Sequence, residues 1–201
     1  KCDWSSDVCS SDLFARVIES LHPDTVVLAS RWNNYLRGCV FEGRTLARQH
    51  FMMSDGHDDK VLASLTYRED IFRRHLQAIV DRLSVHSQVL ILTQPMDLAQ
   101  RTFREVEASD LTVSRAEVDE WHAPEQAMFS QLKLPPNAQI VDVKRLFCNE
   151  QGCATRLKGT LLYRDDNHLS PLGIKQVWQA LSDSSAGVVR SAQTAHVMQQ
   201  R

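Results

Sequence analysis

The sequence predicts an α/β domain built on a parallel β-sheet. Two continuous apolar runs, TVVLAS from Thr25 to Ser30 and VLILTQ from Val89 to Gln94, have the length and the β-branched content of buried strands. A long amphipathic segment separates them, and a strand, a helix and a second strand in that order predict a right-handed βαβ unit. With 201 residues, the chain is about the size of one such domain.

The elements of the first half follow from local signals. A short helix is expected over residues 14–21, and His22-Pro23 ends it before the first strand. Asp58 and Asp59 are expected to cap a helix that runs to Leu83, because apolar residues recur there at helical spacing. That stripe consists of Leu65, Phe72, Leu76, Ile79, Val80 and Leu83. The second strand is expected to stop at Pro95, which cannot donate to a sheet.

The second half carries weaker signals until its end. Between Met96 and Leu134 the sequence is polar, and the only helix we predict there starts near Pro124 and ends before Pro135-Pro136. A third strand is expected from Ala138 to Cys148, followed by a short loop, Asn149 to Gly152. Ser170 and Pro171 then predict the N-cap and first residue of a last helix. Its apolar face would hold Ile174, Val177, Trp178 and Leu181.

The two ends of the chain are expected to lie outside the domain, which we assign to residues 14–184. Ser5 to Leu13, SSDVCSSDL, resembles a sequencing-adapter oligonucleotide translated in frame, so we interpret residues 1–13 as a non-native leader. A disordered Ser/Asp-rich tail is the alternative. If the adapter interpretation holds, the native sequence starts near Phe14 and whatever preceded it is absent. Residues 185–201 are expected to form a flexible tail.

Composition narrows the range of functions. The 23 Lys and Arg residues nearly balance the 25 Asp and Glu residues, and they are scattered, which argues against a nucleic-acid partner. The longest apolar runs, Val26 to Ala29 and Val89 to Leu92, are far shorter than the roughly 20 residues that cross a bilayer. No secretory signal is visible at the start of the chain.

Asp165 and His168 are the residues that point most directly to chemistry. They lie three positions apart in a turn before the last helix, so both side chains can project from one loop. A carboxylate that accepts from one imidazole nitrogen leaves the other nitrogen free to take a proton from a serine. As a bare pattern, however, an acid and a histidine at this spacing also arise by chance.

The residues around this pair give the pattern its specificity. The segment from Leu146 to Gly173 resembles the C-terminal block of the SGNH domains that are fused to acyltransferase-3 membrane proteins. VVLASRW, from Val26 to Trp32, is similar to the third conserved block of that family, and LILTQPMDL is similar to the strand and proline after its long helix. The shared features are Cys148 and Cys153, Tyr163, Asp165 and His168, Leu169-Ser170, and Gly173.

The resemblance implies a three-layer, flavodoxin-like SGNH fold and a Ser-His-Asp triad. Asp165 and His168 would be the acid and the base, and the nucleophile would be the serine of an N-terminal Gly-Asp-Ser motif. The 201 residues contain no such motif. We therefore expect a domain that lacks its N-terminal strand and nucleophile turn and is itself inactive. Ser30 follows a strand but lacks the glycine and aspartate context, and we interpret it as a strand-end residue.

The oxyanion donors are not identified by the resemblance. Other SGNH enzymes carry Gly-x-Asn-Asp in the third block, whereas this chain has Ser30, Arg31, Trp32 and Asn33 there. The acyltransferase-fused branch is similar in having Arg-Trp at this place. Arg31 and Asn33 remain candidates for oxyanion or substrate contacts. Trp32 has two interpretations, a packed aromatic residue at the top of the sheet or a platform that faces a sugar.

The cysteines and the acidic residues each allow more than one interpretation. Cys148 and Cys153 flank a four-residue loop that a disulfide can close, and the resemblance supports that bridge and hence an oxidising compartment; a metal pair is the rival interpretation. Cys39 would then remain a free thiol. The acidic run from Asp55 to Asp59 is metal-like but is typical of helix capping, and Asp166 is expected to face solvent or stabilise the turn.

The resemblance implies an O-acyltransferase, with O-acetyl transfer to a cell-surface polysaccharide such as lipopolysaccharide O-antigen or peptidoglycan. Its partners would be an acyl donor, a polysaccharide acceptor and an N-terminal membrane acyltransferase domain absent from this sequence. That membrane domain would tether the domain on the periplasmic side of the bacterial inner membrane. No metal or organic cofactor is needed. A secreted carbohydrate esterase of the same fold and a non-catalytic glycan-binding module are the alternatives.

Overall fold

The central sheet has three parallel strands in the order β1-β4-β6. The computed structural model of the chain describes residues 14–37, 40–41, 44–45, 65–98, 112–165 and 168–182. Within these, β1 spans Thr25–Leu28, β4 spans Gln88–Leu92 and β6 spans Ala138–Val141. The predicted α/β class with a parallel sheet is confirmed.

The middle strand of this sheet divides two apolar cores. In β4, Val89 and Ile91 face one core, whereas Leu90 and Leu92 face the other, as expected for side chains that alternate along a strand. All four are nearly inaccessible to solvent. Burial on both faces explains why this strand reads as a continuous apolar run.

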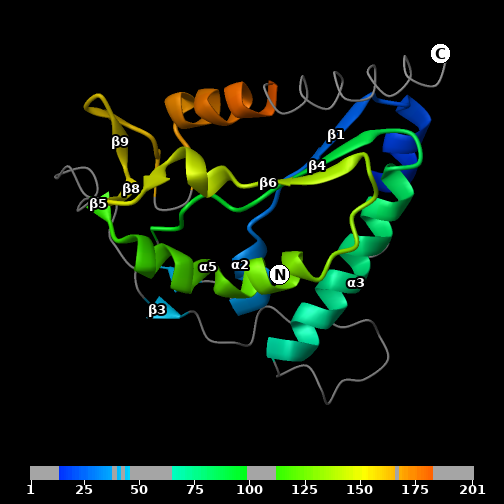
Figure 1. Ribbon diagram of the computed structural model, residues 1–201, viewed down its shortest axis with the longest axis horizontal. Helices are drawn as coiled ribbons and strands as arrows, with labels where there is room; N and C mark the ends of the chain where they lie inside the picture. Colours follow the sequence, from blue (N-terminus) through cyan, green and yellow to red (C-terminus); the bar gives the residue numbers. More distant parts are fainter. Residues whose placement is uncertain are drawn as a thin grey trace, which may run out of the picture.

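Helices cover both faces of the sheet and so complete three layers (Figure 1). One core contains residues of α2 (Trp32–Arg37), α3 (Leu65–Leu83) and α5 (Arg115–Ser130). The helix of residues 171–182 packs against the opposite face. A helix at residues 14–21 leads into β1, and its Glu19 forms an ion pair with Arg82 of α3.

The apolar stripe predicted for the long helix is present in α3. Phe72, Leu76, Val80 and Leu83 are buried in the core, and Ile79 packs against it. Residues 51–64 lie outside the described part of the chain, so the capping role predicted for Asp58 and Asp59 lies there too. Cys39, Asp166 and residues 1–13 and 185–201 are likewise outside the described residues.

Two predicted boundaries are wrong, and polar side chains explain both. α5 begins at Arg115 rather than near Pro124, because the Ser114 hydroxyl accepts from the backbone N–H of Glu117 at 3.2 Å and caps an earlier start. The third strand ends at Val141 rather than at Cys148. The Asp142 carboxylate accepts from the backbone N–H of Lys144 at 3.1 Å and starts the 3-10 helix Val143–Leu146.

Short antiparallel strands form the periphery. β5 (Thr112–Val113), β8 (Gly152–Ala154) and β7 (Cys148–Asn149) make one small sheet, in which Cys148 lies opposite Cys153. A disulfide joins these two cysteines, as the family resemblance implied. β9 (Arg156–Leu157) pairs with β10 (Thr160–Leu161), and β2 (Val40–Phe41) pairs with β3 (Arg44–Thr45).

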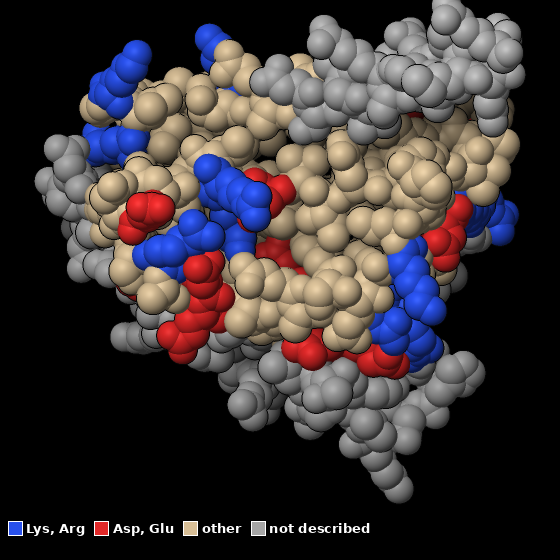
Figure 2. All heavy atoms as spheres, viewed as in Figure 1, with Lys and Arg blue, Asp and Glu red and all other residues tan. Residues whose placement is uncertain are grey.

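Charged side chains of both signs are interspersed on the face seen in Figure 2. Pairs such as Asp70 with Arg73 and Arg115 with Asp119 lie on the outer surfaces of α3 and α5. The hydrogen bond from Arg73 to Asp70 holds the pKa of that carboxyl below its ordinary value. Within the described residues, no helix combines the length and apolar character needed to span a membrane.

Gly173 is required where the last helix meets the preceding chain. A Cβ atom at this position would overlap the backbone carbonyl oxygen of Leu162 and press on the Leu169 side chain. Because a backbone atom cannot move aside cheaply, Gly173→Ala is expected to lower the free energy of unfolding by about 2 kcal/mol, measured by urea denaturation. Lys175→Ala, on the exposed side of the same helix, is the control and should change stability by under about 0.5 kcal/mol. Equal stability of the two variants would contradict the close approach.

Candidate functional site

The predicted acid and base lie side by side in one turn. The backbone N–H of Arg164 donates to the carbonyl of His168 at 2.8 Å, and Tyr163 forms an antiparallel bridge with Leu169, which together close the turn. Asp165 accepts from the backbone N–H of His168 at 2.7 Å. These hydrogen bonds fix the positions of Asp165 and His168 in addition to the contact between their side chains.

The Asp165 carboxylate holds the imidazole ring in one orientation. Its two oxygens lie 2.9 and 2.8 Å from His168 Nδ1. The His168 side chain is 57% exposed and that of Asp165 is 36% exposed, so the ring is accessible from solvent. With Nδ1 directed at the acid, Nε2 is the nitrogen that can act on another group.

The turn is tied to the last helix by Ser170. The Ser170 hydroxyl donates to the Leu161 carbonyl at 2.7 Å and accepts from the Gly173 backbone N–H at 3.3 Å. Its backbone N–H donates to the Leu162 carbonyl at 2.9 Å. Ser170 therefore acts as the predicted N-cap and also joins the helix to the strand region before the turn.

The buried side chain of Tyr163 attaches the same turn to the core. Its side chain is almost fully buried, and burial raises the pKa of the phenol far above its ordinary value, as does the negative charge of Asp97. The phenol is therefore neutral at physiological pH. Tyr163 also packs against Phe147, with ring centroids 6.1 Å apart. Tyr163 is one of the features that the sequence shares with the family, and its packing beneath the turn explains why a tyrosine suits this position.

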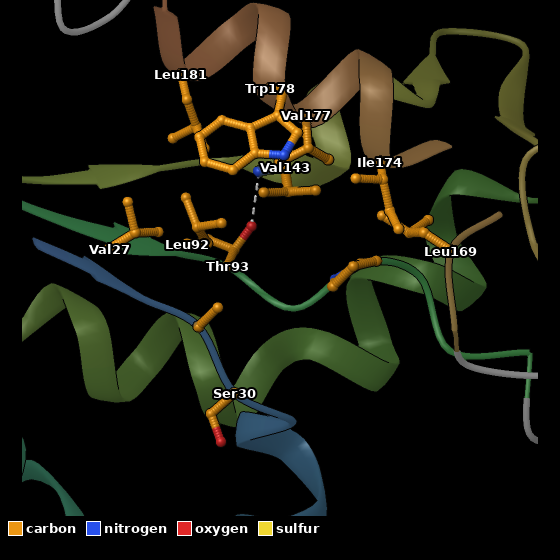
Figure 3. Close-up of a pocket in the computed structure, with 12 residues that line it drawn as sticks. Val27, Ser30, Leu92, Thr93, Val143, Leu169, Ile174, Val177, Trp178 and Leu181 are labelled. Atoms are coloured by element: carbon orange, nitrogen blue, oxygen red, sulfur yellow. Dashed lines mark hydrogen bonds between the residues drawn. The ribbon is translucent and has the colours of Figure 1, made fainter. Parts of the chain in front are cut away.

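A cavity connects the turn to the carboxyl ends of the parallel strands. It has a volume of about 310 Å³ and is bordered by Leu169, the neighbour of His168, and by Ser30 and Thr93, which follow β1 and β4. Most of its lining is apolar. In Figure 3 the Ser30 hydroxyl points away from Trp178 and Leu181, which cover the cavity from the last helix. The hydrogen bonds of the His168 ring described in the structure join it to Asp165 and not to Ser30.

Trp32 lies in the core behind the carboxyl end of β1. Its Nε1–H donates to the Leu92 carbonyl at 2.7 Å, and its ring meets Phe72 and Phe129 edge to face, with centroids 5.6 Å away in each case. The side chain is buried. Of the two interpretations from the sequence, the structure places Trp32 in the packed position.

Asn33 belongs to a buried polar cluster that the sequence did not predict. Its Nδ2 lies 3.1 Å from Glu125 Oε2 and 3.0 Å from His122 Nδ1, and its backbone N–H donates to the Gln94 side chain at 2.9 Å. Asn33, His122 and Glu125 have no solvent exposure, and Gln94 has almost none. The Asn33 amide nitrogen therefore makes its contacts inside the protein, and Asn33 does not line the cavity.

Glu125 is the centre of this cluster. Its Oε1 accepts from the backbone N–H of Gln94 at 2.6 Å, and its Oε2 lies 2.6 Å from His122 Nδ1. One carboxylate thus ties α5 to α2 and to the chain that follows β4. In the sequence, this cluster is indicated by the spacing of His122 and Glu125, which lie three residues apart and so share one face of a helix.

Arg31 is the predicted candidate that keeps access to solvent. Its guanidinium lies 3.4 Å from the Asp97 carboxylate, and the side chains are 38% and 1% exposed. Asp97 also accepts from the Gln94 side chain at 3.3 Å, which links Arg31 to the Glu125 cluster. Among the described residues, no three His, Cys, Asp or Glu side chains are grouped as a metal site.

These features define the class of the protein: an α/β domain with a parallel sheet and an Asp-His pair near the carboxyl ends of its strands. The chain belongs to the family of SGNH domains fused to AT3 domains, whose family model matches residues 3–183. No curated protein sequence is significantly similar to it. The family and the α/β SGNH fold predicted from the sequence are thereby confirmed.

A solved structure shows the same fold. The periplasmic domain of a lipopolysaccharide acetyltransferase from Salmonella serovar Paratyphi A superimposes with a TM-score of 0.51 at 14% sequence identity. The match covers 86% of this chain and 60% of the Salmonella domain, so this chain spans less than two thirds of that domain. At this identity the likeness concerns the fold alone.

Proposed function

We propose that this domain supplies the acid and the base of a serine acyl-transfer site. The observation that carries the proposal is the contact of both Asp165 oxygens with His168 Nδ1, at 2.9 and 2.8 Å, in a turn fixed by backbone hydrogen bonds. Because Nδ1 is taken up by this contact, Nε2 is the ring nitrogen that would accept the proton. Membership of the SGNH family supports acyl transfer as the chemistry.

The reaction proceeds in two half-steps. A serine Oγ attacks the carbonyl carbon of the acyl donor and gives its proton to His168 Nε2, which passes that proton to the departing donor group. An acyl-serine results. In the second half-step an acceptor hydroxyl gives its proton to Nε2 and takes the acyl group, and the proton returns to the serine. Asp165 stabilises the imidazolium in both half-steps.

The acceptor in this proposal is a hydroxyl group of a cell-surface polysaccharide, and the acyl group is acetyl. The Salmonella domain with this fold comes from a lipopolysaccharide acetyltransferase and is periplasmic, which supports this choice of substrate and compartment. The disulfide between Cys148 and Cys153 is compatible with an oxidising compartment. An AT3 membrane domain would deliver the donor and tether the domain to the inner membrane. Transfer to water instead of a sugar would make the same site an esterase.

A fluorophosphonate probe tests the serine requirement. The 201 residues contain no Gly-Asp-Ser motif, so the chain alone is expected to show no labelled serine by peptide mass spectrometry. A form extended at its N-terminus by a Gly-Asp-Ser strand-and-turn segment should be labelled at that serine, and p-nitrophenyl acetate should add one acetyl group there. Stoichiometric labelling of Ser30 in the unextended chain would overturn the proposed nucleophile.

A further inference from the structure

A second cavity, of about 300 Å³, lies between the β9–β10 hairpin, the 3-10 helix Val143–Leu146 and the last helix. We call it the hairpin groove. It shares no lining residue with the cavity that Ser30 borders. Among the described residues, no Asp or Glu lines it. Its lining combines two cations, two amides and two exposed leucines: Arg145, Arg156, Asn149, Gln176, Leu146 and Leu157.

Positive charge is concentrated around the hairpin groove. Between Lys144 and Arg164 the sequence has five basic residues and a single acidic one, Glu150, whereas the whole chain has 23 basic and 25 acidic residues. Figure 2 shows Lys and Arg side chains at the upper left, which is the end of the molecule where β9 lies in Figure 1. The local charge therefore favours an anionic ligand at this end.

Arg145 keeps donors available at the groove. Its side chain is 80% exposed, and its Nε lies 3.3 Å from the Asp142 carboxylate, which does not line the groove. A guanidinium carries five N–H donors, so this one contact leaves donors for a second anion. Arginine often binds carboxylate and phosphate groups through two parallel hydrogen bonds, which suits both classes of anion.

The hairpin turn holds Arg156 in place on the other side of the groove. Lys158 and Gly159 both have positive φ, at 52° and 80°, and they join Leu157 to its partner Thr160 as the two central residues of the turn. The Arg156 Nη1 donates to the Gly159 carbonyl at 2.9 Å, across this turn. The turn therefore orients the guanidinium before any ligand binds, which reduces the entropy lost on binding.

The remaining lining suits a saccharide better than a bare ion. The Asn149 side-chain oxygen accepts from the backbone N–H groups of Gln151 and Gly152, at 2.9 and 3.2 Å, which leaves its NH₂ group to donate outward. Leu146 and Leu157 are each 38% exposed. A sugar offers hydroxyl groups to an amide and C–H groups to a leucine, whereas an inorganic anion offers only charge.

We propose that the hairpin groove binds an acidic segment of a polysaccharide, with Arg145 and Arg156 on its carboxylate or phosphate groups. The inference rests on the proposed function, because it assigns the acceptor to the anionic polysaccharides. Leu162 lines the groove and precedes Asp165 by three residues, which span at most about 11 Å. A short oligosaccharide covers such a distance, so a polysaccharide held in the groove would reach the exposed His168.

Binding is tested with saccharides that differ in charge. The 201-residue chain is titrated with hexagalacturonate, with maltohexaose phosphorylated on its primary hydroxyls, and with neutral maltohexaose, and binding is followed by calorimetry and backbone NMR. At least one anionic saccharide is expected to bind roughly tenfold or more tightly than maltohexaose, and to shift the amide signals of Asn149 and Leu157 but not that of Ala127 on α5. The better anionic probe identifies the charged group as carboxylate or phosphate. Raising the NaCl concentration from about 0.05 to 0.5 M should weaken this binding.

Three variants test the arginines. Arg145→Gln and Arg156→Gln are each expected to weaken binding of the better anionic probe roughly tenfold, because each removes a charge-assisted contact. Arg156→Lys keeps the charge but loses the paired donors, and should fall between Arg156→Gln and the original chain. Arg74→Gln is the matched control, since it removes the same charge from an exposed position on α3 and should leave the affinity unchanged.

The outcomes separate this inference from the proposed function, because the titration needs no serine. Absence of binding by both anionic saccharides, or equal binding of maltohexaose, would overturn the groove and leave the acyl-transfer site untouched. Equal binding of hexathymidylate would also overturn it, since any polyanion would then suffice. Binding in the groove without fluorophosphonate labelling of the form extended by a Gly-Asp-Ser segment would support the groove and count against the proposed function.

Discussion

Replacement of His168 by alanine is expected to lower acyl transfer by about 10³- to 10⁴-fold in the form extended by a Gly-Asp-Ser segment. In the proposed mechanism the imidazole takes the serine proton, and its Nδ1 lies against the Asp165 carboxylate. Loss of the ring removes the base, while the exposed position of His168 keeps the effect on stability small. The measurement is the initial rate of p-nitrophenyl acetate turnover, with thermal unfolding of each variant as a check.

Asp165→Asn and His86→Ala make this experiment specific. The asparagine variant keeps the size of the side chain but loses the charge that orients the ring, so a loss of comparable size is expected. His86 is exposed and precedes β4, at the amino end of the sheet, so its replacement should leave the rate unchanged. A His168→Ala variant that retains more than about a tenth of the rate would show that another group is the base.

Replacement of Glu125 by leucine is expected to lower the free energy of unfolding by about 3 kcal/mol or more. The carboxylate accepts from the Gln94 backbone N–H and contacts His122 and Asn33, all with negligible exposure. Leucine fills the volume but leaves these buried groups without an acceptor. Urea unfolding monitored by circular dichroism measures the loss.

Gln126→Ala is the matched control for Glu125, because Gln126 is the next residue of α5 and faces solvent. Its effect should be under about 0.5 kcal/mol. Glu125→Gln keeps one acceptor oxygen and should fall between the two. A Glu125→Leu variant that loses less than about 1 kcal/mol would show that the cluster does not hold α2, α5 and the chain after β4 together.

The sheet was predictable because burial on two faces leaves a strong trace in the sequence. β1 and β4 are continuous apolar runs, and the α3 stripe repeats at helical spacing, so each signal extends over many residues. The start of α5 and the end of β6 instead depend on single side chains, Ser114 and Asp142. A single capping side chain is a weak signal beside the more familiar reading of Pro124 as a helix start.

The candidate site was predictable to the extent that it is local. Asp165 and His168 are three residues apart, so their contact requires only one turn. The Glu125 cluster joins Asn33, Gln94 and His122 from three separate elements. Nothing in the local sequence around Asn33 indicates that its amide turns inward. The sequence therefore offers Trp32 and Asn33 as substrate or oxyanion candidates, whereas the structure places both side chains in the interior.

The bonds that build the Asp165-His168 turn all begin and end within a short stretch of chain. Arg164 bonds to His168, Ser170 to Leu161 and Leu162, and Gly173 to Ser170. Local hydrogen bonds therefore fix the shape of the turn, and the packing of Tyr163 on Phe147 attaches it to the rest of the domain. Grafting residues 161–174 between relatives should therefore exchange the proton-handling half of the site while the recipient keeps its own choice of acceptor.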